Sequence, residues 1–365
     1  MKTELYKKLN QSEIEAFGQE MEALRLEIQA KLGQTDADYI EAIYRKTRYY
    51  EILGRFFIHF SVEPLAWLSG VGFLSLAKII NNMELGHNVM HGQYDWMNHP
   101  ELNSRDFDWE HVSDNEQWKF SHNYMHHTYT NIVGRDHDFG YNLLRLSTDQ
   151  QWHPLNLPQT IYTVVQALLF DFGIGSHGTT VEYAELDPAQ KTNAQRRAIG
   201  MRFLKKITSQ TWKDYLLFPM LGGLSAPKIA LGNFFANLVR NIWTHSVIVC
   251  GHFTEHVETF TTTEAENEGI GGFYLRQLKG SSNLSGSERF YMLTGHLSHQ
   301  IEHHMFPDIP ANRYEEMAPR VQAICEKYGQ FYNTGGFWEQ YASVWKRILA
   351  YSFPDPIARQ IMPAA

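Results

Sequence analysis

The chain has 365 residues, of which 43% are hydrophobic and 20% are charged, so it can bury a large core and is neither disordered nor collagen-like. Acidic residues outnumber basic ones by 40 to 32, which gives a net charge of −8 and argues against a nucleic-acid partner. The two cysteines, Cys250 and Cys325, are too few for a disulfide framework or a cysteine-rich zinc module.

Residues 1–50 have the pattern of a soluble amphipathic helix. Apolar residues recur there at spacings of three and four, which places them on one helical stripe, and glutamates fall between them. The first residues are polar and contain no apolar core of a signal peptide, so we do not expect secretion. The stripe consists of Ile14, Phe17, Met21, Leu24 and Ile28.

Three apolar zones follow, at residues 56–83, 157–170 and 215–253. The longest uncharged run in the first zone is Pro64–Ala77, which is shorter than the ~20 residues that identify a membrane helix. The third zone is long enough for two helices joined by a turn near residues 222–227, but Lys228 and Arg240 interrupt it. Hydropathy alone therefore leaves two interpretations open, a membrane core of four helices and a soluble helical bundle.

Histidines gather in three short motifs, GHNVMHG, SHNYMHHTYTN and GHLSHQIEHHMFP. Each motif contains two histidines four residues apart, which share a helix face and can bind one metal ion. The adjacent pairs at 126/127 and 303/304 differ by about 100° around a helix, so each pair can reach two ions. The motifs therefore predict a dinuclear metal centre. Their members are His87, His91, His122, His126, His127, His296, His299, His303 and His304.

Other metal sites fit this pattern less well. A single zinc ion needs only three or four ligands, and the HExxH motif of zinc proteases is absent. Soluble di-iron bundles use repeated Glu-x-x-His motifs, and this chain has one match, from Glu84 to His87.

The order of the three motifs resembles that of the membrane fatty acid desaturases. That family carries HxxxH, then Hx(2–3)HH, then (H/Q)xxHH, and this chain has matching residues over roughly positions 50–330. The segments HNVMHGQYDWMN and GHLSHQIEHHMFPDIPANRY are most similar to bacterial acyl-CoA and linoleoyl-CoA desaturases. The third motif has Gln300 where many desaturases have histidine.

The resemblance implies an all-α integral membrane fold with about four transmembrane helices in two hairpins. The hairpins would span about residues 49–82 and 214–250, and a cytosolic helical cap at about 84–213 and 251–330 would hold the metals. Residues 1–48 would form an N-terminal cytosolic helical segment and residues 331–365 a C-terminal cytosolic tail. The protein would lie in the bacterial inner membrane with its active site facing the cytoplasm.

The resemblance also implies two iron ions, cycling between Fe2+ and Fe3+, with O2 as co-substrate. A further ligand is expected near the cytosolic end of the fourth membrane helix, where His252 is favoured slightly over His245. His299 or Gln300 could complete an iron site. The expected ligands are His87, His91, His122, His126, His127, His252, His303 and His304.

Carboxylates near the motifs could orient the ligand imidazoles by accepting their other N–H group. An ordinary salt bridge or helix cap explains each of these carboxylates about as well. Trp96, Tyr124 and Trp243 are candidates for the wall of an acyl tunnel, although simple packing is the commoner role of such residues. The candidate carboxylates are Glu84, Asp95, Asp136, Asp138 and Glu302.

The resemblance implies an O2-dependent desaturase that inserts a cis double bond into a long acyl chain, with an acyl-CoA as the expected substrate. The haem-binding HPGG motif of fused desaturases is absent, so electrons would come from a ferredoxin or from a flavin and iron–sulfur reductase. An alkane or fatty acid hydroxylase with the same histidine motifs is the first alternative. A non-catalytic membrane protein that binds metal is a remote one.

Overall fold

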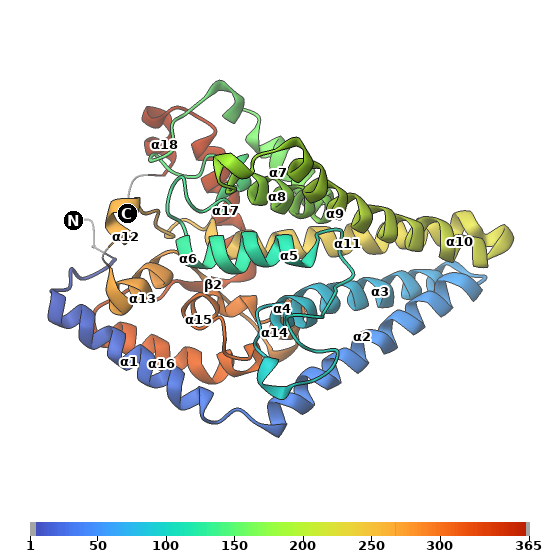
Figure 1. The fold of residues 1–365 in the computed structure, drawn as a ribbon, viewed down its shortest axis with the longest axis horizontal. Helices are drawn as coiled ribbons and strands as arrows, with labels where there is room; N and C mark the ends of the chain where they lie inside the picture. The colour runs from blue at the N-terminus through green and yellow to red at the C-terminus, as the bar shows by residue number, and fades with distance from the viewer. Residues whose placement is uncertain (1–4, 267, 363–365) are drawn as a thin grey trace.

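The computed structural model describes residues 5–266 and 268–362, and almost all regular structure in that part of the chain is helical (Figure 1). The all-α prediction is thus confirmed in its coarse form. Two short strands, β1 (Asn283–Ser285) and β2 (Thr334–Gly336), pair in parallel.

Helix α1 (Gln11–Gln29) buries the predicted apolar stripe. Asn10 and Glu13 form a capping box that satisfies the first free N–H groups of this helix. Phe17, Met21 and Ile28 are fully buried, and they share one core cluster with residues of α15 (Gln300–Met305) and α16 (Tyr314–Lys327). The N-terminal segment therefore packs directly against the helix that carries the third histidine motif.

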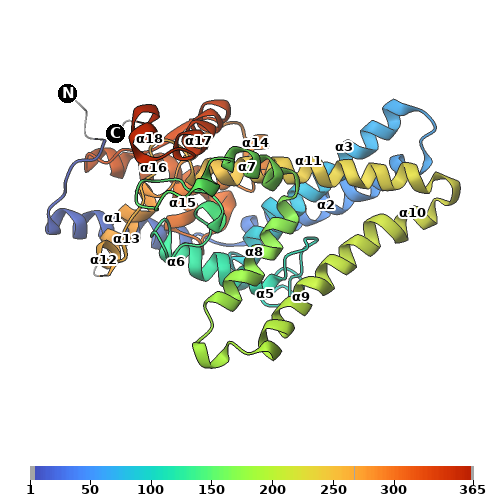
Figure 2. The same ribbon diagram turned by 90° about the horizontal axis from the view of Figure 1, so that it is seen from above.

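Four helical segments extend together to one end of the molecule (Figures 1 and 2). They are α2 (Gln34–Phe60), α3 (Pro64–Ile80), the π-turn η7 (Lys213–Leu217) with α10 (Phe218–Leu221), and α11 (Ala226–His252). Helix α3 packs against both α2 and α11. We call this part of the molecule the helical arm. It contains the two segments for which the sequence predicted hairpins.

The tip of the helical arm exposes large apolar side chains. Phe60, Leu65 and Leu221 are 71, 73 and 70% exposed. Among the residues that the structure describes, one helix is long and apolar enough to cross a membrane. It is the continuous stretch Pro64–Met90. Lys228 near the start of α11 donates hydrogen bonds to the carbonyl oxygens of His59 and Ser61 at the end of α2, which ties the two helices together.

Glycine allows α2 and α3 to approach closely. A Cβ atom at Gly54 would lie 2.6 Å from the backbone nitrogen of Leu74, and one at Gly70 would lie 2.8 Å from that of Ile58. Neither backbone can move without separating the two helices. The close contact between α2 and α3 therefore depends on glycine, which has no side chain, at both positions.

We expect Gly54→Val to destabilise the helical arm by about 1–3 kcal/mol, because the new side chain overlaps the backbone of α3. Thermal denaturation of the purified protein measures this change. Gly72→Ala is the matched control, since a Cβ atom there meets nothing within 4 Å. Equal melting temperatures for the two variants would contradict this account of the contact.

The remaining helices form a body at the other end of the molecule, which carries the histidine motifs (Figures 1 and 2). Its α-helices are α4 (Asn88–Met90), α5 (Asn115–Trp118), α6 (His127–Tyr129), α7 (Gln159–Leu168), α8 (Phe170–Ala184), α9 (Asn193–Trp212), α12 (Thr262–Ala265), α13 (Gly269–Lys279), α14 (Glu288–Leu293), α15, α16, α17 (Phe337–Tyr351) and α18 (Asp355–Ile361). Short 3-10 turns lie at 95–97, 140–142, 154–156, 188–190, 223–225, 297–299 and 311–313.

The first two histidine motifs lie on wide π-helical turns rather than on regular α-helix. These turns are η1 (Asn81–His87) and η3 (Lys119–His126). A π-turn inserts an extra residue into the helix and often marks a functional site. The sequence analysis assumed that these histidines lie on regular α-helix. The π-turns change the directions of the side chains, and therefore change which imidazoles face each other.

Candidate metal centre

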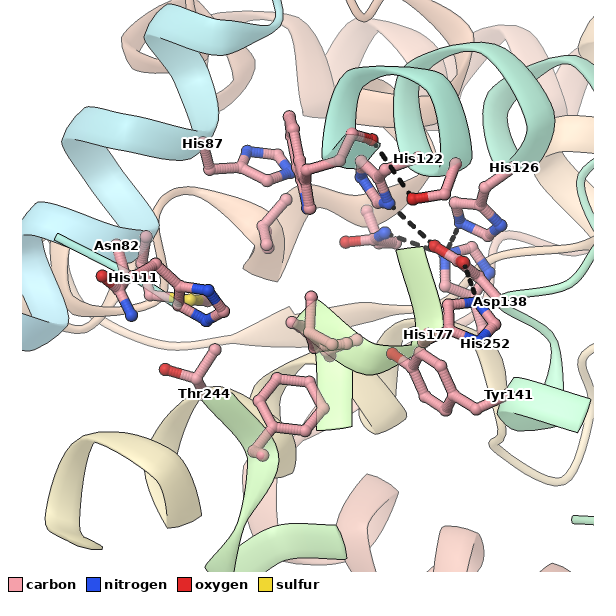
Figure 3. A pocket seen from close by; sticks show the side chains of 18 of the residues that line it. Asn82, His87, His111, His122, His126, Asp138, Tyr141, His177, Thr244 and His252 are labelled. Carbon is pink, nitrogen blue, oxygen red and sulfur yellow. Dashed lines mark hydrogen bonds and ion pairs between the residues drawn. The ribbon is translucent and has the colours of Figure 1, made fainter. Parts of the chain in front are cut away.

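Eight histidines from four parts of the chain converge on one region of the body. They come from η1 and α4, from η3 and α6, from the end of α11, and from α15. Figure 3 shows four of them, His87, His122, His126 and His252, around a chamber. The eight are His87, His91, His122, His126, His127, His252, His303 and His304.

The first group combines His87, His91, His122 and His303, whose candidate ligand atoms all lie within 4.8 Å of one another. In each of these residues the Nε2 atom is buried and has no hydrogen-bond partner among the described residues. Four unpartnered nitrogens at this spacing are costly unless they bind something, and imidazole nitrogen suits iron, zinc and copper. The donor set therefore fits a metal ion.

The second group combines His126, His252 and His304 at the same spacing. The Nε2 atoms of His126 and His252 lie 3.2 Å apart. His127 lies between the groups, because its nitrogens also approach those of His303 and His304 and its ring stacks on that of His304 at 4.3 Å. Two separate groups, connected through His127, fit two neighbouring ions better than one.

The protonation state of three of these imidazoles suits metal binding. Burial holds the pKa values of His127, His303 and His304 well below the usual histidine value. The three side chains are therefore neutral near pH 7, and a neutral imidazole has a lone pair for a metal ion.

Two carboxylates orient ligand imidazoles. The Nδ1 atom of His126 lies 3.0 Å from both carboxylate oxygens of Asp136, and that of His122 lies 3.0 Å from Asp138. A hydrogen bond to Nδ1 leaves Nε2 free to face an ion. The Nε2 atom of His177 donates a hydrogen bond to the other oxygen of Asp138 at 2.9 Å. Its position on α8, far from the motifs in sequence, offered no signal.

The other three candidate carboxylates bind other partners. Glu84 lies 2.8 Å from Nδ1 of His296 and accepts a hydrogen bond from Tyr39. Asp95 accepts from Ser104. Neighbouring residues on a helix point about 100° apart, so Glu302 turns away from its histidine neighbours. It accepts hydrogen bonds from Asn283 and Tyr332, and burial raises its pKa to about 7.

The structure separates the remaining ligand candidates. His252 belongs to the second group, whereas His245 packs against Phe170 and lies in none of the groups. The His299 ring packs against that of Tyr291 at 4.6 Å. The side-chain amide of Gln300 lies 2.9 Å from Nε2 of His252. Gly251 permits this approach, because a Cβ atom there would lie 2.8 Å from the amide carbon of Gln300.

A narrow central chamber lies against four of the histidines (Figure 3). Aromatic and aliphatic side chains form most of its wall, which suits an apolar ligand. His111 and His177 also line it and were not expected there. The apolar part of the wall includes Met83, Trp109, Trp118, Phe170, Ile174, Ile248, Phe253 and Leu297.

The three tunnel candidates from the sequence do not line the central chamber, so their place in an acyl tunnel stays a prediction. Trp96 and Tyr124 are 40 and 53% exposed at the surface. Trp243 packs against Phe290 and Phe337 and donates its indole N–H to the carbonyl oxygen of Leu293.

Comparisons with known proteins agree with the motifs. A family profile described as fatty acid desaturase matches residues 65–336. The NADPH-dependent stearoyl-CoA 9-desaturase of Mycobacterium tuberculosis is 38% identical over 363 residues, covering 98% of this chain and 84% of that protein. The sn-1 linoleoyl-lipid 6-desaturase of Synechocystis is 25% identical over 279 residues, covering 73% of this chain and 74% of that protein.

Proposed function

Because the chain belongs to the fatty acid desaturase family, we propose that it is an oxidoreductase that inserts a cis double bond into a long fatty acyl chain carried on coenzyme A. The observation that carries the proposal is a largely apolar chamber whose wall includes four of the eight convergent histidines, His87, His122, His126 and His252. Similarity to a stearoyl-CoA 9-desaturase over nearly the whole chain supports the acyl-CoA substrate.

Two iron ions would be held by the two histidine groups. His87, His91, His122 and His303 would hold one ion, and His126, His252 and His304 the other, with His127 between them. Bound iron would supply the oxidising power, with O2 as co-substrate, to remove hydrogen from an unactivated carbon chain, which side chains alone cannot do.

The residues of the chain would position the substrate and keep water away. Trp118 packs on the imidazole of His122 at 4.7 Å and also lines the central chamber, so an alkyl chain beside it lies next to a ligand. Asp138 contacts Nδ1 of His122, and His177 contacts the other oxygen of Asp138, so the two residues together fix the ring of His122. Such fixed placement brings the C–H bonds close to the metal site and excludes side reactions with water.

We also propose that the helical arm is the membrane part of the protein. The hairpins at about 49–82 and 214–250 would cross the bacterial inner membrane, with the body, the segment 1–48 and the tail 331–365 on the cytoplasmic side. Exposed Phe60, Leu65 and Leu221 at the tip support contact with lipid. The charges that lower the hydropathy of this arm are paired inside it, as between Lys78 and Asp214 at 2.8 Å.

Electrons would come from a separate protein. A ferredoxin, or a reductase with flavin and an iron–sulfur centre, could supply them, and the NADPH dependence named for the mycobacterial relative fits such a donor.

Expression in a bacterial host together with a ferredoxin-type reductase tests the proposal. Total fatty acids are analysed by mass spectrometry after derivatisation of double bonds. We expect a new double bond that is absent from cells expressing the His303→Ala, His304→Ala variant. A hydroxylated product would favour the hydroxylase alternative. Iron-loaded protein that forms no product with several donors and chain lengths would contradict desaturation and favour metal binding alone.

A further inference from the structure

One of the three apolar zones of the sequence, residues 157–170, lies outside the helical arm. No Asp, Glu, Lys or Arg occurs between Asp149 and Asp171. In the structure this zone forms α7 and the start of α8. Helix α7 packs against α11, close to the place where the helical arm meets the body (Figures 1 and 2). An uncharged segment therefore borders the part of the protein that we place in the membrane.

Helix α7 turns its apolar side outward. Its buried residues, Gln159, Thr163 and Ala167, are four positions apart and form one stripe that faces the protein. Large apolar side chains occupy the outer side, and 41 to 63% of their surface is exposed. A surface helix of a water-soluble protein has the opposite arrangement, with its apolar stripe toward the core. We define the apolar belt as the exposed residues Ile161, Val164, Val165, Leu168, Leu169 and Phe172.

Hydrogen bonds fix α7 in this orientation. The side-chain amide of Gln159 donates to the carbonyl oxygens of Arg145 and Ile348, and its oxygen accepts from the backbone N–H of Arg145. The hydroxyl of Thr163 donates to the carbonyl oxygen of Gln159. Turning the helix to bury its apolar side would break the bonds to Arg145 and Ile348. The polar side is therefore satisfied inside the protein, and the apolar belt needs a covering from outside.

The apolar belt continues the exposed apolar surface of the helical arm. The side-chain amide of Asn241 on α11 donates to the carbonyl oxygen of Leu168 at 2.9 Å, so the end of α7 lies beside this part of α11. Val239 and Ile242, the neighbours of this contact on α11, are themselves exposed. A medium that covers the arm up to Ile242 therefore also reaches the apolar belt.

The helical arm by itself is shorter than a bilayer. The stretch of α11 from Ala226 to Val239 covers about 21 Å at 1.5 Å per residue, whereas the hydrocarbon layer is about 30 Å thick. Roughly 9 Å of that layer then falls at the level of the apolar belt. Arg240 at this level is buried and paired with Asp171, so its charge does not meet lipid.

We propose that the apolar belt is immersed in the cytoplasmic leaflet of the bilayer, so that lipid covers the outer side of α7 as well as the helical arm; this inference rests on the proposed membrane position of the arm. The lipid acyl chains would contact the belt, and the body would sit directly on the membrane. An amphipathic helix with an apolar outer side binds a bilayer in this way.

An exposed tryptophan lies near the same level of α11. Trp338 at the start of α17 is 77% exposed, and its neighbour Phe337 stacks on Trp243 of α11 with ring centres 5.9 Å apart. Tryptophan is enriched where hydrocarbon meets the lipid headgroups, because its ring is apolar and its N–H is polar. Trp338 thus supports a membrane boundary close to residue 243 of α11.

Fluorescence quenching on the full-length protein in phosphatidylcholine–phosphatidylglycerol vesicles tests the proposal. Single cysteines are introduced by Val164→Cys in the apolar belt, Leu231→Cys in the helical arm and Leu26→Cys on α1, and each is labelled with bimane. The three native side chains are matched in exposure, at 47, 49 and 50%. The native cysteines are buried, so the unsubstituted protein should take up no label. Brominated phosphatidylcholine quenches a label in lipid, and iodide quenches a label in water.

We expect brominated lipid to quench the label at position 164 at least about threefold more than the label at 26, and about as much as the label at 231. Iodide should show the reverse order. Quenching at 164 by iodide as strong as at 26, with 231 in lipid, would overturn the apolar belt and leave the arm in the membrane.

Two further outcomes would also overturn the proposal. A label at 164 that neither quencher reaches would show that a second copy of the chain or another protein covers the belt. A label at 231 that iodide quenches would contradict the membrane position of the helical arm itself, so the two failures are distinguishable.

Discussion

Replacing His303 and His304 together by alanine should abolish product formation and remove most of the bound iron. His303 belongs to the first histidine group, His304 to the second, and both belong to the group that His127 joins. Under the proposed function, the double variant would therefore remove a ligand from each ion at once. Because even the loss of a supporting hydrogen bond lowers metal affinity by about 10- to 100-fold, we expect a loss of more than 100-fold here. Iron per chain, measured by mass spectrometry, and product analysis provide the two readouts.

His252 and His245 offer a comparison within one helix. His252→Ala should lower the iron content, because its Nε2 faces that of His126 at 3.2 Å. His245→Asn should retain iron, because His245 lies in none of the groups and packs against Phe170. Equal losses of iron in these two variants would refute the ligand set read from the structure.

Replacing Asp136 by asparagine should lower iron affinity by about 10- to 100-fold while preserving the shape of the side chain. The carboxylate lies 3.0 Å from Nδ1 of His126 and also accepts a hydrogen bond from the backbone N–H of Asn131 at 2.7 Å. It therefore orients the ligand and holds the loop after α6 in place. Asparagine loses the negative charge that strengthens the imidazole as a ligand. Retention of iron against increasing chelator measures the effect.

Asp95→Asn is the control for this prediction. Asp95 also lies close to a histidine motif in sequence, but its carboxylate accepts hydrogen bonds from Ser104. We expect iron retention equal to that of the wild type. Melting curves of both variants without iron separate a weaker site from a less stable fold. If Asp136→Asn retained iron as firmly as Asp95→Asn, the orienting role of Asp136 would be excluded.

The membrane assignment shows where local sequence is ambiguous. Hydropathy alone left two interpretations open because charged residues such as Lys78 and Asp214 interrupt the apolar zones. In the structure these two side chains pair at 2.8 Å inside the helical arm, so they face each other rather than the surroundings. Which side of a helix meets its neighbours depends on residues more than a hundred positions away, and no window of sequence contains that information.

The histidine motifs and the amphipathic stripe of α1 could be predicted from sequence alone, because both depend on spacings of three and four residues within one helix. Local spacing predicts two metal ions, and the order of the three motifs indicated, by resemblance, the desaturase family that the comparisons show. Only the tertiary structure shows that His252, and not His245, lies in a histidine group. It also places Asp136 and Asp138 against Nδ1 of His126 and His122, and Asn82 and Thr244 in the chamber wall. Those relations join separate helices and π-turns, and the packing of distant segments sets them rather than the periodicity of any one of them.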